Sequence, residues 1–193
     1  MGIVNWFIEA VKHPRELSTV FPSSPFLANT IADQLDFSEP RTIAELGPAD
    51  GALTRPIVDR MHPDSDLYLI EVNDAFCDDL REKYRDHEKT DAIHVINRGA
   101  EELVEISKEN NIDGFDYVVS GIPLTTLPDS VSQQILQSTL DALKPDGRYV
   151  QFQYSQDYRD TIESYFGPVE LERVWLNILP AWVYVADKEN APD

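Results

Sequence analysis

An alternation of short apolar runs with amphipathic segments constrains the fold of this chain more than any other feature. The first run ends at Gly47, and apolar side chains then recur at helical spacing over residues 53–61. The strand-like runs cover residues 43–46, 67–70, 93–96, 117–120 and 149–154. Because strands that alternate with helices need crossover connections, this order predicts a parallel sheet in an α/β fold.

The two ends of the sequence depart from this alternation. Residues 171–175 and 181–185 are β-type runs joined by a short connector, so we expect a closing hairpin with Trp175, Trp182 and Tyr184 in its core. Residues 1–12 have the pattern of a short apolar helix that stops before a proline. A second helix of about three turns is expected to begin near Phe26.

Length and cysteine content indicate one globular domain over residues 1–193. The single cysteine, Cys77, excludes a disulfide-built scaffold and a zinc ribbon, and it favours a reducing cytoplasm. No apolar run is long enough to span a bilayer, and the first residues lack the pattern of a secretory signal. We therefore expect a cytoplasmic protein, in solution or at a membrane surface. The four histidines show no metal-binding spacing, so no metal is predicted.

The charge balance is strongly acidic. The chain has 35 acidic and 16 basic side chains, for a formal net charge of −19. Such a field repels phosphate backbones, so nucleic acid is disfavoured as a partner. The acidic residues are spread along the chain, which is typical either of a salt-adapted surface or of an ordinary acidic enzyme.

A glycine-containing turn follows the first strand-like run. Gly47 and Gly51 lie where backbone amides can approach a ligand at the start of a helix. Glu71 ends the next run, near the offset of about 20 residues at which an acidic side chain binds ribose hydroxyls. The spacing matches neither the dinucleotide fingerprint nor a P-loop, because no third glycine and no Gly-Lys-Ser/Thr follow. A ligand with a ribose but without a pyrophosphate fits this pattern best.

These residues resemble the first motif of the class I S-adenosylmethionine-dependent methyltransferases. That motif reads acidic-x-Gly-x-x-x-Gly, and Glu45, Gly47 and Gly51 match it. The chain is more narrowly similar to the bacterial phospholipid N-methyltransferases, which are relatives of the ribosomal RNA adenine dimethylases. The segments that carry this similarity are residues 13–15, 20–24, 45–55, 120–124, 150–154 and 177–184.

The resemblance implies a fold and a set of cofactor contacts. The fold is a Rossmann-like domain with a seven-stranded sheet, parallel except for the last strand, in which residues 1–40 form an N-terminal helical lid and residues 41–187 the core. Glu71 would bind the ribose hydroxyls of S-adenosylmethionine, and Val72 would lie against its adenine. The remaining implied cofactor contacts are Glu45, Gly47, Asp50, Gly51, Ala100, Glu101 and Ser120. Ala100 stands where relatives often carry an acidic residue, so Glu101 is the nearest carboxylate there.

The loop after the fourth run bears on the methyl acceptor. Adenine methyltransferases carry Asn/Asp-Pro-Pro-aromatic at this point, whereas residues 120–124 read Ser-Gly-Ile-Pro-Leu. No aromatic side chain is available there to stack on a flipped base. The departure favours the amine of a phospholipid such as phosphatidylethanolamine, with Ser120, Pro123 and Tyr154 as candidate catalytic residues. Tyr154 would face the positive charge that accumulates on the amine.

Two alternative functions and two roles for the first helix stay open. The chain could instead be a relative of the RNA adenine dimethylases, or a protein that binds S-adenosylmethionine without transferring its methyl group. The helix over residues 1–12 suits a lid over the cofactor. It equally suits shallow insertion at a bilayer surface, because Trp6 and Phe7 lie near Lys12 and Arg15 in the sequence.

Overall fold

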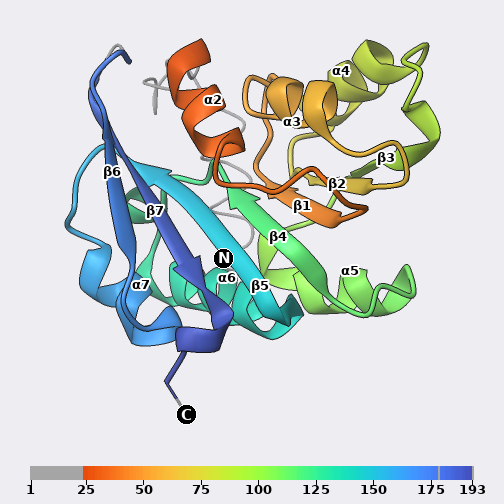
Figure 1. The fold of residues 1–193 in the computed structure, drawn as a ribbon. Helices are drawn as coiled ribbons and strands as arrows, with labels where there is room; N and C mark the ends of the chain where they lie inside the picture. The colour runs from red at the N-terminus through yellow and green to blue at the C-terminus, as the bar shows by residue number, and fades with distance from the viewer. Residues whose placement is uncertain (1–23, 178, 193) are drawn as a thin grey trace.

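The computed structural model describes residues 24–177 and 179–192, so the predicted helix over residues 1–12 and its two roles lie outside it. Seven strands form one sheet in the order β3-β2-β1-β4-β5-β7-β6 (Figure 1). The strands are β1 (Thr42–Leu46), β2 (Asp66–Ile70), β3 (Ile93–Ile96), β4 (Phe115–Ser120), β5 (Leu143–Gln153), β6 (Glu170–Val174) and β7 (Ala181–Asp187). Only β7 runs antiparallel to its neighbours within these residues, which confirms the predicted topology.

Helices cover both faces of the sheet (Figure 1). The α-helices are α2 (Pro25–Ala32), α3 (Thr54–Arg60), α4 (Asp74–Tyr84), α5 (Leu103–Glu109), α6 (Asp129–Ala142) and α7 (Arg159–Phe166). Short 3-10 turns are η1 (Thr90–Ala92), η2 (Ala100–Glu102), η3 (Leu124–Thr126) and η4 (Lys188–Asn190). Apolar side chains of α2, α3 and α4 pack on one face, and those of α5, α6 and α7 pack on the other.

Strand alternation divides the core into these two clusters. On β1, Ile43 joins the cluster under α2, α3 and α4, whereas Ala44 and Leu46 join the opposite one. Since successive side chains of a strand point to opposite faces, Glu45 lies on the same face as Ile43. The sheet therefore buries a carboxylate next to its glycine turn.

The fifth strand begins earlier than the sequence pattern predicts. We expected a strand from Tyr149, but β5 already starts at Leu143, which pairs with Phe115. The register then shifts before Tyr117 pairs with Arg148. A side chain at Gly147 would come within 2.8 Å of the Phe115 carbonyl oxygen, so the glycine allows this irregular stretch to stay against β4.

The closing hairpin forms as predicted, with one exception in its core. Tyr184 is fully buried, and its hydroxyl donates to the Ser155 carbonyl at 2.9 Å. Trp182 is partly buried. The prediction for Trp175 is wrong, because β6 ends one residue earlier and this side chain is 63% exposed. It therefore has no partner strand to pack against.

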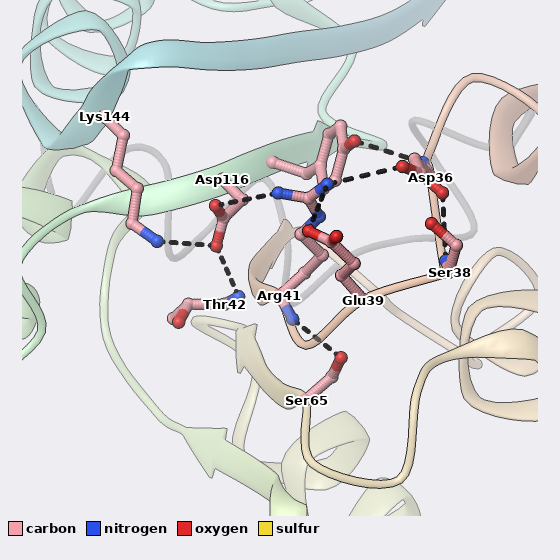
Figure 2. A network of polar contacts seen from close by, with 9 residues as sticks. Asp36, Ser38, Glu39, Arg41, Thr42, Ser65, Asp116 and Lys144 are labelled. Carbon is pink, nitrogen blue, oxygen red and sulfur yellow. Dashed lines mark hydrogen bonds and ion pairs between the residues drawn. The ribbon is translucent and has the colours of Figure 1, made fainter.

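A polar network joins the amino ends of β1, β4 and β5 (Figure 2). Asp116 accepts hydrogen bonds from the Thr42 amide at 2.7 Å and from Lys144 Nζ at 2.8 Å. Its other oxygen lies 3.7 Å from Nη1 of Arg41. The Arg41 guanidinium also pairs with Asp36. These contacts fix the strand ends at the edge of the sheet away from the predicted ligand site.

Candidate cofactor and acceptor site

The loops that follow β3, β2, β1 and β4 are linked to one another by backbone hydrogen bonds. The Glu71 amide donates to the Ile96 carbonyl at 3.0 Å, and the Gly47 amide donates to the Ile70 carbonyl at 2.9 Å. The Gly121 amide completes the series by donating to the Leu46 carbonyl at 2.9 Å. The carboxyl ends of four adjacent strands thus form one continuous edge, where ligands of parallel sheets bind.

The glycine turn has the backbone conformation that its sequence predicts. Gly47, Ala49 and Gly51 have φ values of 68°, 49° and 76°, a region that glycine adopts at little cost. The Gly51 amide donates to the Pro48 carbonyl at 2.8 Å. A side chain at Gly47 would come within 2.9 Å of the Ile122 side chain, so the cofactor loop and the loop after β4 touch at this point.

Glu71 is held beside this turn by two backbone amides. Its Oε2 accepts from the Ala49 amide at 3.1 Å, and its Oε1 accepts from the Asn73 amide at 2.9 Å. The side chain is only 5% exposed, and burial raises its pKa. A carboxylate fixed next to a glycine turn has the position and chemistry to accept hydrogen bonds from ribose hydroxyls. The residues present therefore fit the adenosyl part of S-adenosylmethionine.

Glu45 is a buried carboxyl group without a hydrogen-bond partner among the described residues. It is fully buried, and neither of its side-chain oxygens has a donor within residues 24–177 and 179–192. Burial raises its pKa to about 8. The hydroxyls of Thr54 in α3 and Tyr84 in α4 are likewise buried and unpaired within that part of the chain. The contact of Glu45 with the cofactor stays a prediction.

We expect Glu45→Gln to change how stability depends on pH. The carboxyl group is protonated in the folded protein up to about pH 8 but releases its proton at about 4.5 when unfolded. Wild-type stability therefore falls across this window as the pH rises, and levels off above it. Thermal unfolding without cofactor should show the variant gaining stability relative to wild type across the window. A constant difference in melting temperature would contradict the assignment.

The other predicted cofactor contacts lie along the same edge. Val72 is half-buried after Glu71, and Ala100 is buried at the start of η2. The carboxylate of Glu101 occupies the space that a side chain at Gly99 would fill. Asp50 is exposed, and it lines a groove of about 430 Å³ between α2 and α3. These placements bring the predicted residues to one edge, but their contacts with a cofactor stay predictions.

The loop after β4 is fixed by two glutamines that the sequence analysis did not single out. The Ile122 carbonyl accepts from Nε2 of Gln151 at 2.6 Å and from Nε2 of Gln153 at 3.3 Å. Both glutamines are buried on β5, and the Tyr149 hydroxyl hydrogen-bonds to Gln151. The only sequence signal was two amides at alternate positions of an otherwise apolar strand. The two glutamines therefore hold residues 120–124, which we call the acceptor loop, against β5.

The predicted acceptor residues surround this loop. Ser120 is fully buried at the end of β4, and its hydroxyl accepts from the Ile122 amide at 3.3 Å. Pro123 is exposed, and its carbonyl accepts from the amide and the hydroxyl of Thr126. Tyr154 is 37% exposed directly after β5, and burial raises its pKa.

The carbonyl groups of this loop differ in how they are engaged. Those of Ile122, Pro123 and Leu124 each accept a hydrogen bond from the protein. The Gly121 carbonyl accepts none from the part of the chain that the structure describes. It is therefore available to a ligand next to the glycine turn.

Sequence comparison places two kinds of methyltransferase close to this chain. The profile of the family described as ribosomal RNA adenine dimethylase matches residues 11–152. An ornithine lipid N-methyltransferase of Singulisphaera acidiphila is 28% identical over 174 residues, which cover 90% of this chain and 89% of that protein. Ribosomal RNA small subunit methyltransferase A of Mycoplasma mycoides is 30% identical over 120 residues, covering 62% of this chain and 41% of that protein.

Several solved structures share this fold. TrmN from Thermus thermophilus superposes with a TM-score of 0.66 at 15% identity, over 84% of this chain and 48% of that one. TrmK of M. capricolum, solved with S-adenosyl-homocysteine, gives a TM-score of 0.65 at 14% identity, over 86% and 69% of the two chains. Among residues 24–177 and 179–192, no helix combines the length and apolarity needed to cross a membrane.

Proposed function

The chain belongs to the ribosomal RNA adenine dimethylase family and is an S-adenosylmethionine-dependent methyltransferase, and we propose that its methyl acceptor is the amine of a lipid. The relative named as an ornithine lipid N-methyltransferase supports this proposal, since it aligns over nearly the full length of both chains. The amine of phosphatidylethanolamine and that of an ornithine lipid are the two headgroups to consider.

One observation carries the proposal: charged residues are sparse on the acceptor side of the ligand edge, which we define as the ends of β4 and β5, the start of α2 and the β6–β7 connection, with Arg173 at its margin. Four stretches that meet at this side, residues 24–32, 117–128, 149–156 and 174–186, contain no Lys, Arg, Asp or Glu. They contain the start of α2, the ends of β4 and β5, and the connection between β6 and β7. In a chain of net charge −19, this concentrates neutral and apolar side chains around the acceptor loop.

This distribution favours a lipid over RNA. A protein that binds RNA neutralises phosphates with lysine and arginine side chains, and these four stretches offer none. The cofactor side of the edge carries the acidic residues Asp50 and Glu71 instead, which would repel a phosphate backbone. A neutral acceptor side is compatible with a headgroup whose acyl chains need apolar contacts.

The protein's task in methyl transfer is alignment. The cofactor, when bound, supplies a methyl group attached to a sulfonium leaving group. The Gly121 carbonyl and the Ser120 hydroxyl would accept hydrogen bonds from the amine N–H groups, and so direct the nitrogen lone pair toward the methyl carbon. The Tyr154 hydroxyl stays protonated near neutral pH because its pKa is raised, so it would face the amine without acting as a base.

The test compares acceptors directly. Protein with labelled S-adenosylmethionine is incubated separately with phosphatidylethanolamine vesicles, with ornithine lipid vesicles and with ribosomal RNA. We expect label in one of the lipids and none in RNA. Tyr154→Ala should lower this transfer but retain cofactor binding, because Tyr154 follows β5, is 37% exposed and is not among the predicted cofactor contacts. Label found in RNA alone would overturn the proposal.

A further inference from the structure

The exposed large apolar side chains of the described residues gather around the acceptor side. They are Phe26, Tyr154, Trp175, Leu176 and Leu179, each between 37% and 63% exposed. We call this set the apolar rim. The β6–β7 connection, which carries three of them, lies at the carboxyl end of β6 beside α2 (Figure 1). Apolar surface concentrated at one place marks an interaction site more often than scattered apolar residues do.

Two carbonyl groups and the Asn177 side chain of the β6–β7 connection form hydrogen bonds within the protein. The Ser24 hydroxyl donates to the Leu176 carbonyl at 2.8 Å, and the Ser24 amide donates to Oδ1 of Asn177 at 3.0 Å. Nδ2 of Asn177 donates to the Leu179 carbonyl at 2.9 Å. Since unpaired backbone groups are costly in an apolar medium, these bonds lower the cost of presenting the apolar side chains of the connection there.

The charges near the apolar rim favour a lipid surface as the partner. No Asp or Glu occurs between Arg173 and Ala186, in a chain with 35 acidic residues. The Arg173 guanidinium carbon lies 3.6 Å from the centre of the Trp175 ring and 5.0 Å from that of Trp182. A cation beside an exposed tryptophan is the combination found where proteins contact lipid headgroups. A second copy would bring another net charge of −19, which opposes self-association here.

The chain outside the described residues also joins the structure at this place. Residues 1–23 connect to Ser24, which is bonded to Leu176 and Asn177. That segment carries apolar residues from Ile3 to Val11 with Lys12 and Arg15 close behind. Its composition is therefore suited to the same kind of partner as the rim itself.

We propose that the apolar rim docks this enzyme on the surface of a phospholipid bilayer, with the tip of the β6–β7 connection entering the headgroup layer. The inference rests on the proposed lipid acceptor and extends it, because it says how an acceptor embedded in a membrane reaches the site. Docking at this edge brings headgroup amines to Gly121 without extracting the lipid.

The test measures flotation of the full chain with vesicles of phosphatidylcholine and phosphatidylethanolamine. Leu176→Asp places a charge at the tip and should lower the bound fraction at least tenfold. Thr90→Asp adds the same charge at the exposed start of η1, at the opposite edge of the sheet, and should leave binding within twofold of wild type. Calorimetry with S-adenosylmethionine confirms that both variants keep a folded cofactor site.

A second measurement separates docking from the acceptor chemistry. Methyl transfer to a short-chain phosphatidylethanolamine dissolved as monomers should be unchanged in Leu176→Asp, whereas transfer to vesicles should fall with binding. If both variants float like wild type, or both lose binding equally, the docking proposal is overturned. Wild type that floats but methylates only RNA would overturn the lipid acceptor and leave the docking surface standing.

Discussion

Replacing Glu71 by alanine should weaken S-adenosylmethionine binding by about thirtyfold or more. The change removes a carboxylate that would accept hydrogen bonds from the ribose, and it leaves the Ala49 and Asn73 amides without their acceptor. Losing charge-assisted bonds at a buried site costs about 2 kcal/mol or more, which corresponds to this factor. Calorimetric titration of folded protein with S-adenosylmethionine measures the effect directly.

Two further variants make that experiment specific. Glu71→Gln keeps an acceptor for one of the two amides but removes the charge, so its affinity should lie between those of alanine and wild type. Asp74→Ala removes an exposed carboxylate three residues further along, and its affinity should stay within about twofold of wild type. An alanine variant at residue 71 that binds as tightly as wild type would refute the cofactor site described above.

Asp116→Ala should have the largest effect on folding stability. The carboxylate is mostly buried and holds β1 through the Thr42 amide and β5 through Lys144 (Figure 2). Removing the carboxylate leaves the partly buried Lys144 and the Thr42 amide without this acceptor, which should lower the free energy of unfolding by about 3 kcal/mol. Urea denaturation with a fluorescence readout gives this difference.

The Asp116 network lies far from the cofactor edge, so its loss should lower folding stability without changing cofactor affinity. Asp116→Asn retains an oxygen that can accept from Thr42, so it should cost about half as much as alanine. Below the unfolding transition, both variants should bind S-adenosylmethionine as wild type does, because the network lies at the amino ends of the strands. Cofactor affinity that falls in parallel with stability would show that the two edges of the sheet are coupled.

The alternation of strands and helices, and the meeting of Glu71 with the glycine turn, could be predicted because they depend on local patterns. A glycine turn after a buried strand and an acidic residue after the next one specify the edge in any parallel sheet. The end of β6 could not be read in the same way. Trp175 continues a β-type run in the sequence, but whether a strand continues depends on the partner strand, and Val174 is the last residue that pairs.

The support of the acceptor loop was also hidden from the sequence. Gln151 and Gln153 read as polar residues in a strand, and only the pairing of β4 with β5 brings their amides under the Ile122 carbonyl. Likewise, Asp116 and Lys144 are ordinary charged residues until the sheet brings them within 2.8 Å. Contacts between distant segments set both features, and a single sequence does not display them.

The close approach of Gly47 to Ile122 limits where new acceptor preferences can arise. A side chain at Gly47 would come within 2.9 Å of Ile122, and the Ile122 carbonyl also accepts a hydrogen bond from Gln151 of β5. A substitution at Gly47 or Ile122 would therefore disturb the predicted cofactor loop and the acceptor loop together. Relatives whose methyl acceptors differ should therefore vary at Thr125, Thr126 and Leu176, which are exposed and are not among the predicted cofactor contacts.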